Sequence, residues 1–235
     1  MSVYAVIPAA GTGERFGAPV PKPLVELCGR PVLAHTLAVF EQCAGIDGII
    51  LVVHPRYHQE YSALVARYGF SRVTAVVDGG ATRSASVRNA LRALPAQASC
   101  VIVHDSVRPL VTPELISQGL ALAAVDRAAI AAVPVKPSLK LVDPQTRLVR
   151  ETLDRSLVWD IQTPQVFERN LLERAHAQDF VADDDSALVE KCGVPVRVYM
   201  GDYKNIKITT AEDLLVARAF MEAAVKEPHV SARLV

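Results

Sequence analysis

The sequence predicts an α/β fold in which a mostly parallel, twisted sheet is flanked by helices. Short runs of β-branched residues alternate with longer segments of helical periodicity, which is the pattern of parallel strands joined by crossover helices. The chain has 235 residues, enough for one large domain with a full core. Its first strand runs directly into a glycine-rich loop. We therefore expect a single domain over residues 1–235 with a ligand site at that loop.

The elements of this sheet follow one another along the first 135 residues. Strands are predicted at 3–8, 48–53, 72–77, 100–104 and 129–135, and helices at 31–44, 56–68, 82–94 and 112–125. The last of these helices begins at Thr112-Pro113, an N-cap residue followed by proline at the first helical position. Ligands bind at the carboxyl ends of strands in open sheets of this kind, so the site is expected at that edge.

The pattern changes after the fifth strand. Residues 136–153 are predicted to form a β-hairpin with its turn at Asp143-Pro144. A two-stranded hairpin is only marginally stable by itself, so we expect this β-hairpin arm, at about 136–158, to pack on another part of the protein or on a second subunit. The remaining elements are helices at 168–177, 184–192 and 210–225, a strand at 195–200 and a loose tail at 227–235.

Composition argues against several classes of protein. The formal net charge is zero, so there is no global basic field to attract nucleic acid. Each apolar stretch is interrupted before it reaches the about 18 residues that a membrane span needs. The N-terminal segment lacks the basic region of a cleavable export signal. The four cysteines are far apart, which disfavours a disulfide framework and a zinc site. We expect a cytoplasmic protein without a membrane segment.

The loop at residues 8–17 is the most informative segment. Gly11 and Gly13 let backbone N–H groups approach a phosphate chain, and Arg15 and Lys22 bring positive charge to the same place. Two glycines alone are equally typical of a tight strand-to-helix turn. The two cations favour a nucleoside-triphosphate site.

The loop does not fit the two commoner phosphate-binding patterns. A Walker loop needs Lys and Ser/Thr directly after its last glycine, whereas Gly17 is followed by Ala18. A dinucleotide fingerprint needs a third glycine one position earlier and an acidic residue at the end of the second strand, which here ends in His54-Pro55. ATPase and NAD-binding functions are therefore disfavoured.

Asp105 directly follows an apolar strand. A carboxylate at a strand end beside a phosphate loop is the hard oxygen ligand that a Mg²⁺-triphosphate complex needs. A turn-forming aspartate paired with Arg108 is the competing interpretation. His104 has no metal cluster around it in the sequence pattern, and we interpret it as a packing or orienting residue.

Two further segments contain candidate ligand-binding groups. Gly79-Gly80 and the hydroxyl-rich helix start that follows, up to Ser86, suit recognition of a base edge, although a plain N-cap explains Thr82 or Ser84 equally well. Lys204 and Lys207 precede the last helix. Surface lysines are usually only solvated, so Lys207 is a candidate functional residue only when it is considered together with the other motifs of the sequence.

The ordered set of motifs strongly resembles the 2-C-methyl-D-erythritol 4-phosphate cytidylyltransferases of the non-mevalonate isoprenoid pathway, from about residue 3 to residue 225. The resemblance rests on Pro8 to Gly17, Pro21-Lys22, Gly79-Gly80, His104-Asp105-x-x-Arg108-Pro109, Asp154-Arg155, Gln162-Thr163-Pro164-Gln165 and Asn205-Ile206-Lys207. It implies a Rossmann-like nucleotidyltransferase fold and a Mg²⁺-dependent reaction. The 4-phosphate oxygen would attack the α-phosphorus of CTP in line and release pyrophosphate.

The resemblance also implies roles for individual residues. Those that would bind CTP are Ala9, Ala10, Gly11, Gly13, Arg15, Lys22, Gly80, Ala81, Ser86 and Asp105, the last also holding Mg²⁺. Those that would contact the acceptor are Ser106, Arg108, Thr163 and Lys207, joined by Ser138 and Arg155 from the partner's arm. The catalytic residues would be Arg15, Lys22 and Lys207. Nucleotidyl transfer needs positioning and charge neutralisation more than proton transfer, which agrees with this set.

The chain departs from the family pattern at a few of these positions. Ala81 replaces an acidic residue and removes a side-chain contact to cytosine, while Ser138 replaces a frequent threonine and keeps the hydroxyl. Pro23, Ser106 and Val107 also differ. No cation and no metal ligand is lost, so we expect the chemistry to persist.

Three alternatives remain open on the sequence. A ribitol-5-phosphate cytidylyltransferase shares most of these motifs, and a sugar-phosphate nucleotidyltransferase with another base shares the glycine loop. A nucleotide-binding regulatory protein without turnover belongs to a different class. The intact set of Arg15, Lys22, Asp105 and Lys207 argues against the last of these.

Overall fold

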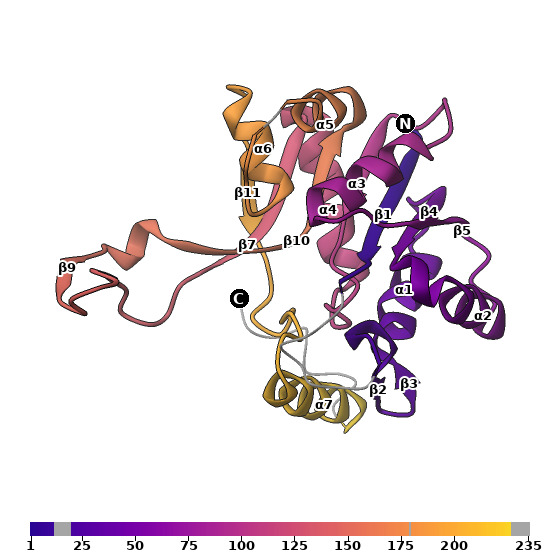
Figure 1. Ribbon diagram of the computed structural model, residues 1–235, viewed down its shortest axis with the longest axis horizontal. Helices are drawn as coiled ribbons and strands as arrows, with labels where there is room; N and C mark the ends of the chain where they lie inside the picture. The colour runs from indigo at the N-terminus through magenta and orange to yellow at the C-terminus, as the bar shows by residue number, and fades with distance from the viewer. Residues whose placement is uncertain (12–19, 179, 227–235) are drawn as a thin grey trace.

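The computed structural model describes residues 1–11, 20–178 and 180–226, which form a central sheet covered by helices on both faces (Figure 1). The seven strands lie in the order β11-β7-β10-β6-β1-β4-β5. In chain order they are β1 (Val3–Ala9), β4 (Gly48–Val53), β5 (Val73–Asp78), β6 (Cys100–Val103), β7 (Ala128–Pro134), β10 (Trp159–Glu168) and β11 (Arg197–Met200). Every neighbouring pair that excludes β10 is parallel, which confirms the predicted mostly parallel α/β sheet.

Strand β10 is the one strand of the seven-stranded sheet that was not predicted from the sequence. It runs antiparallel between β6 and β7, over residues that were left unassigned before the helix predicted at 168. Pro164 lies inside it, and the pairing register with β7 shifts between Ile161 and Gln165. A proline within a run argues against a central strand, which is why the pattern did not reveal it. As a result, Gln162 and Thr163 are buried at the centre of the molecule.

The helices form two layers. One face of the sheet packs against α1 (Val32–Gln42), α2 (His58–Tyr68) and α4 (Pro113–Asp126). The other face packs against α3 (Arg83–Arg92), α5 (Arg169–His176) and α6 (Asp185–Lys191). Strands β1, β4 and β6 are buried on both faces and are correspondingly apolar throughout. The buried apolar area of these two layers is the main stabilising contribution to the fold.

Two helix starts beside the carboxyl edge of the sheet are fixed by side-chain caps. The Thr82 hydroxyl accepts a hydrogen bond from the Ala85 N–H at 3.0 Å, which fixes the start of α3. The Thr112 hydroxyl accepts from the Leu115 N–H at 3.3 Å, and Pro113 occupies the first helical position of α4, as predicted. These caps hold the loops that precede the helices.

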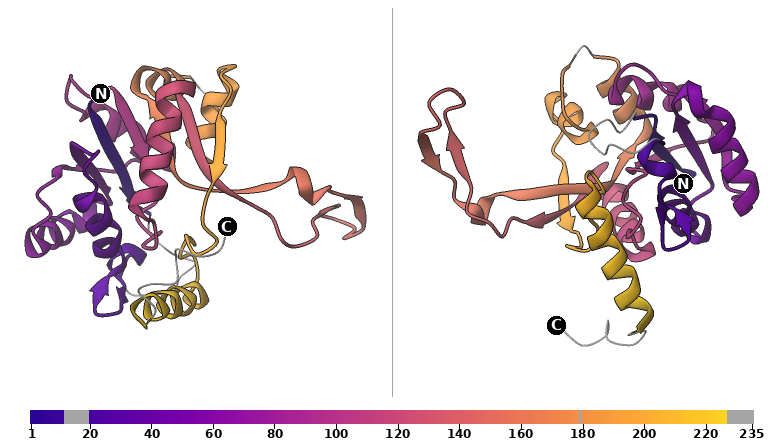
Figure 2. Two further views of the ribbon diagram at one scale, coloured as in Figure 1. Left: turned by 180° about the vertical axis from the view of Figure 1, so that it is seen from behind. Right: turned by 60° about the horizontal axis from the view of Figure 1, so that its bottom comes forward.

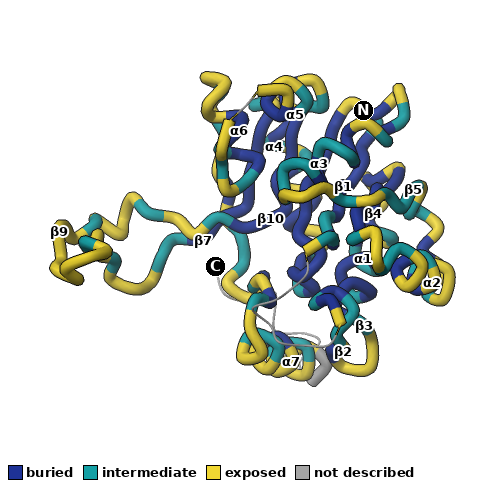
Figure 3. Tube along the Cα trace, viewed as in Figure 1, coloured by how far each residue is buried: buried dark blue, intermediate teal, exposed yellow. Residues whose placement is uncertain are grey.

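The predicted hairpin is present and extends away from the body of the molecule (Figure 2). It comprises β8 (Lys140–Val142) and β9 (Val149–Thr152), which pair antiparallel and are exposed throughout (Figure 3). The Asp143 carboxylate accepts hydrogen bonds from the backbone N–H groups of Gln145 and Thr146, which forms the predicted turn. We call residues 136–158 the arm.

The last helix, α7 (Ala211–Lys226), lies below the carboxyl edge of the sheet, beside the short strands β2 (Glu26–Leu27) and β3 (Arg30–Pro31) (Figure 1). A small apolar cluster joins these segments and consists of Leu27, Val32, Val107, Ile208 and Ala217. It brings the segment before α7 close to the turn at Lys22–Leu24. None of the described helices is long and apolar enough to cross a membrane.

Candidate active site

A cavity of about 560 Å³ opens at the carboxyl edge of the sheet. It lies where the strand-end rule places ligands in sheets of this kind. Six separate segments of the chain contribute described residues to its wall, which is formed by Pro8, Ala9, Ala10, Gly11, Lys22, Pro23, His54, Gly80, Ala81, Thr82, Arg83, Ser86, Asp105, Ser106, Val107 and Lys207. The volume is in the range of small-molecule sites.

One side of the cavity is built from small residues. The loop after β1 touches the loop after β5 so closely that a Cβ placed on Gly79 would lie 2.3 Å from the Ala10 Cβ. The Ser86 hydroxyl accepts from the Gly80 N–H at 3.1 Å and donates to the Thr82 carbonyl at 3.0 Å, which fixes the second loop on the start of α3. This wall presents backbone groups and small side chains to a ligand, as base recognition requires.

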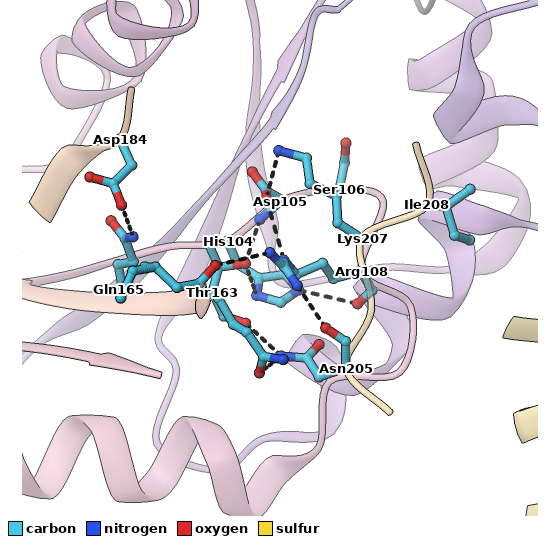
Figure 4. A network of polar contacts seen from close by, with 12 residues as sticks. His104, Asp105, Ser106, Arg108, Thr163, Gln165, Asp184, Asn205, Lys207 and Ile208 are labelled. Atoms are coloured by element: carbon cyan, nitrogen blue, oxygen red, sulfur yellow. Dashed lines mark hydrogen bonds and ion pairs between the residues drawn. The ribbon is translucent and has the colours of Figure 1, made fainter. Parts of the chain in front are cut away.

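The opposite side is charged and centres on Asp105 (Figure 4). Lys207 Nζ lies 3.0 Å from Asp105 Oδ2, Arg108 Nε lies 3.5 Å from the same oxygen, and Arg83 Nε lies 4.0 Å from Oδ1. Burial alone would raise the pKa of Asp105, but Lys207, Arg83 and Arg108 hold it well below its usual range. The carboxylate is therefore ionised and surrounded by an excess of positive charge.

Lys22 completes this cationic side. Its Nζ lies 3.4 Å from the carbonyl oxygen of Ile208, the residue after Lys207. Lys22, Asp105 and Lys207 come from three distant parts of the chain and line one cavity. The arrangement brings two ammonium groups to the place where a polyphosphate would develop additional charge.

A buried hydrogen-bond network holds the segment that carries Lys207. The Arg108 guanidinium donates to the Asn205 carbonyl at 2.7 Å (Figure 4). The Asn205 amide donates to the Thr163 carbonyl at 2.8 Å and to Gln162 Oε1 at 3.3 Å. The missed strand β10 therefore anchors the segment before α7, and with it the position of Lys207.

His104 and Thr163 fix the backbone at Asp105. The Thr163 hydroxyl accepts from the Asp105 N–H at 3.1 Å and lies 3.0 Å from His104 Nδ1, while His104 Nε2 lies 3.3 Å from the Arg108 carbonyl. A neutral imidazole with its proton on Nε2 satisfies both contacts, because Nδ1 then accepts from the hydroxyl. Burial lowers the pKa of His104 to about 4, so it is neutral. The burial and contacts of His104 agree with the predicted role as a packing or orienting residue.

The structure brings together most, but not all, of the residues singled out in the sequence. Ala9, Ala10, Gly11, Lys22, Gly80, Ala81, Ser86, Asp105, Ser106 and Lys207 line the cavity. Arg108 and Thr163 are buried behind its charged side, where their polar groups bind the protein itself. Ser138 and Arg155 are exposed on the arm and do not line the cavity of their own chain. Gly13 and Arg15 lie outside the described residues.

Arg83 also lines the cavity, although no role was predicted for it from the sequence. Its position as the first residue of α3, directly after the capping Thr82, is a signal that could have indicated this. Lys204 is also a cation close to a turn, and it does not line this cavity. Charge and turn context alone therefore do not distinguish them.

Asp105 is the one carboxylate among the described residues that line the cavity, and it is therefore the candidate ligand for a metal ion. Among the described residues, no cluster of three or more His, Cys, Asp or Glu side chains could hold one. Asp105 fits a Mg²⁺ ion that arrives with a triphosphate, because such ions are bound by one or two carboxylates together with phosphate oxygens and water. The closest contact of Arg83 to its Oδ1 is 4.0 Å, and Oδ1 accepts no hydrogen bond from the described residues.

The sequence profile of the 2-C-methyl-D-erythritol 4-phosphate cytidylyltransferase family matches residues 3–223. The chain belongs to this family. The enzyme of that name from Geobacter metallireducens is 41% identical over 231 residues, covering 94% of this chain and 98% of the relative. The enzyme from Syntrophotalea carbinolica is 44% identical over 231 residues, covering 94% and 97%.

Solved structures of cytidylyltransferases of this family share the fold. The 4-diphosphocytidyl-2C-methyl-D-erythritol synthase of Anaerococcus prevotii superposes with a TM-score of 0.82 at 34% identity, covering 94% of this chain and 96% of that one. The Thermus thermophilus cytidylyltransferase gives a TM-score of 0.77 at 31% identity, covering 94% and 100%. The resemblance and the fold class inferred from the sequence are confirmed.

Family membership also decides between the acceptors considered above. The chain is a cytidylyltransferase that joins CTP and 2-C-methyl-D-erythritol 4-phosphate to give 4-diphosphocytidyl-2-C-methyl-D-erythritol. Ribitol 5-phosphate is disfavoured as its acceptor, because the profile and the curated relatives all carry the methylerythritol name.

Proposed function

We propose that this cytidylyltransferase carries out the transfer in the cavity at the carboxyl edge of the sheet, with the cytosine on the small-residue side and the triphosphate on the cationic side. The observation that carries the proposal is the convergence of Lys22, Asp105 and Lys207 on one cavity that is also lined by residues 8–11, the described start of the glycine-rich loop. A neutral, close-fitting wall suits a base, and an excess of positive charge suits phosphates.

The base end of the proposed site is formed by backbone and small side chains. Ala9, Ala10, Gly80 and Ser86 would contact the cytosine, and Ala81 would do so through its backbone. The close contact between the two loops leaves little room for adjustment, so the shape of this wall is expected to select the base.

The phosphate end would be formed by the glycine-rich loop together with the cations. Gly11, Gly13 and Arg15 are the expected cradle of the triphosphate, and Lys22 and Lys207 would stabilise charge in the transition state. The acceptor's 4-phosphate oxygen attacks the α-phosphorus of CTP, and the bond from that phosphorus to the bridging oxygen breaks as pyrophosphate leaves. The reaction then needs no covalent enzyme intermediate.

Asp105 is the residue that would hold Mg²⁺. When bound, the ion would neutralise phosphate charge and help to orient the triphosphate. The chain's own contribution is an ionised carboxylate whose backbone is fixed by Thr163 and whose Oδ2 is held by Lys207. Oδ1, which accepts no hydrogen bond from the described residues, would then bind the ion.

The acceptor would lie between the charged side and a second subunit. Ser106 lines the cavity, and Arg108 and Thr163 lie directly behind it, whereas Ser138 and Arg155 are carried on the exposed arm. Exposed apolar residues on the arm also suit an interface, namely Leu141, Val142, Leu148, Val149 and Leu157. We propose a homodimer in which each arm completes the acceptor site of the other subunit.

We also propose that the protein works in the cytoplasm. Its four cysteines are all free, and two of them are exposed, which suits a reducing compartment.

An acceptor and nucleotide panel tests the proposed function. Pyrophosphate release is measured with CTP and either 2-C-methyl-D-erythritol 4-phosphate or ribitol 5-phosphate, and then with UTP, GTP or ATP in place of CTP. We expect release only with CTP and the methylerythritol phosphate. Nucleotide binding without pyrophosphate release would favour a regulatory protein. Equal release with UTP would contradict the proposal that the small-residue side of the cavity selects cytosine.

Removal of divalent metal tests the role of Asp105. Excess EDTA should abolish pyrophosphate release, and added Mg²⁺ should restore it, because the carboxylate and the phosphates together form the expected ion site. The Asp105→Asn variant should need more Mg²⁺ for half-maximal rate. Full activity in EDTA would rule out the metal dependence.

A further inference from the structure

A buried cluster of charged residues lies behind the cationic side of the cavity. Asp185, in the first turn of α6, is fully buried, and its Oδ2 lies 2.7 Å from Nη1 of Arg83. Arg83 is the first residue of α3 and lines the cavity. The ion pair therefore joins a residue that a ligand can touch to one that it cannot reach.

His176 holds the second oxygen of Asp185. Its Nε2 lies 2.8 Å from Asp185 Oδ1, and its Nδ1 lies 3.3 Å from the hydroxyl of Ser84, the neighbour of Arg83. An imidazole that donates from Nε2 and accepts at Nδ1 satisfies both contacts. Burial would raise the pKa of Asp185, but Arg83 and His176 hold it below its usual value, so the carboxylate is charged. Three helices, α3, α5 and α6, meet at this cluster.

Two carboxylates compete for the Arg83 guanidinium. The Arg83 contact to Asp185 is 2.7 Å, whereas Arg83 Nε is 4.0 Å from Asp105 Oδ1. Attraction between charges grows as distance and solvent exposure fall, so the buried Asp185 is the stronger partner. Without it, the guanidinium would be free to form the short paired contact with Asp105 that arginine and carboxylate favour.

We propose that Asp185, supported by His176, is a positioning residue that holds the Arg83 guanidinium at the wall of the nucleotide cavity and away from Asp105. Arg83 then presents a fixed positive charge to bound CTP, and Asp105 Oδ1 stays open to the ligand. A role in function explains the Asp185–Arg83 ion pair better than a contribution to stability does. Buried ion pairs are often no more stabilising than apolar residues of the same volume.

The Asp185→Asn variant removes the charge but keeps the size of the side chain. We expect the dissociation constant for CTP, measured by calorimetry without acceptor, and the KM for CTP to rise about 10-fold, the loss typical of one charge-assisted contact. The KM for the acceptor should change little. Asp183→Asn is the matched control, because Asp183 is exposed two residues earlier, and it should bind CTP normally.

A double-mutant cycle separates positioning from a general structural effect. Arg83→Gln should weaken CTP binding by a similar factor, and adding Asp185→Asn to it should cause no further loss, because Asp185 acts only through Arg83. Losses that multiply in the double variant would overturn the proposal. So would normal CTP binding by folded Asp185→Asn.

A variant with a milder change keeps the test valid if Asp185→Asn does not fold. His176→Gln leaves both charges in place and removes only the support of Asp185. It should raise the dissociation constant for CTP by about 3-fold, less than the loss of the charge itself. Unchanged CTP binding in this variant would contradict the proposal.

Discussion

The Asp105 carboxylate lies among three cations, namely Lys207, Arg108 and Arg83. Two of these cations also have partners elsewhere in the protein. Arg108 is committed to the Asn205 carbonyl and Arg83 to Asp185, so Lys207 is the cation that holds Asp105 most directly, at 3.0 Å. A triphosphate that enters this cavity meets positive charge already fixed in position. Such preorganisation lowers the reorganisation needed during the reaction.

His104 makes the stability of this site depend on pH. Its pKa is about 4 in the folded protein and about 6.5 when unfolded, so between these values the unfolded chain binds more protons. This contribution to stability is present above pH 6.5 and is lost as the pH falls toward 4. The free energy of unfolding in EDTA should therefore decrease by about 2 kcal/mol between pH 7 and pH 5 on this account.

Urea unfolding of His104→Gln at both pH values checks this contribution. The variant is expected to lose stability overall, because the imidazole contacts are gone, but its dependence on pH should be flatter by about the same 2 kcal/mol. If the free energy of unfolding of His104→Gln still falls by the wild-type amount between pH 7 and pH 5, His104 is not the group responsible.

At the scale of elements, the site depends on how closely two loops approach. The loop after β1 and the loop after β5 follow strands separated only by β4, and Gly79 lets them touch. A Cβ there would lie 2.3 Å from Ala10 Cβ and 3.0 Å from Ser86 Oγ. Since Ala10 and Ser86 belong to the side of the cavity that we propose binds the cytosine, one added methyl group would displace that side.

Gly79→Ala should therefore weaken CTP binding by about 10-fold or more, since small displacements of binding groups reduce function strongly. Calorimetric titration with CTP measures the effect. Gly45→Ala is the control, because a Cβ at that position meets only the Leu120 side chain at an ordinary 3.4 Å. Equal affinities for the two variants would contradict the packing argument.

The exposed apolar surface of the arm supports the proposed dimer interface. Leu148 and Val149 are 69% and 58% exposed in the single chain, which is unusual for apolar neighbours. If the arm packs on a second subunit, Leu148→Asp combined with Val149→Asp should shift the molar mass from dimer to monomer in sedimentation experiments. The KM for the acceptor should rise at the same time.

Val125→Asp provides the matched control for the arm variants. Val125 is 80% exposed near the end of α4 and lies outside the arm. The molar mass of this variant should not change. A wild-type protein that sediments as a monomer at every concentration would contradict the proposed dimer.

For the molecule as a whole, local patterns predicted the sheet and helices well where they were regular. The five early strands and four early helices all appear with ends within a few residues of the prediction. Strand β10 was not predicted because Pro164 and the irregular pairing near it disrupt the local strand pattern. Its pairing with β6 and β7 is also non-local and cannot be seen in a short stretch of sequence.

The site was predictable to the extent that family motifs marked it. Lys22, Asp105 and Lys207 were singled out, and they line one cavity. The Asp185 and His176 cluster was not, because an acidic residue in the first turn of a helix and a histidine in the last turn of another have ordinary local explanations. Their ion pair with Arg83 forms only on folding.

The steady-state turnover of Lys22→Ala tests the central claim most directly, namely that the cations gathered at this cavity carry the transfer. With saturating CTP and 2-C-methyl-D-erythritol 4-phosphate, the account predicts that pyrophosphate release slows by about 10²-fold or more, the effect of removing one transition-state contact. Lys204→Ala, a lysine on the exposed surface three residues before Lys207, should keep normal turnover. A near-normal rate in folded Lys22→Ala would contradict the account.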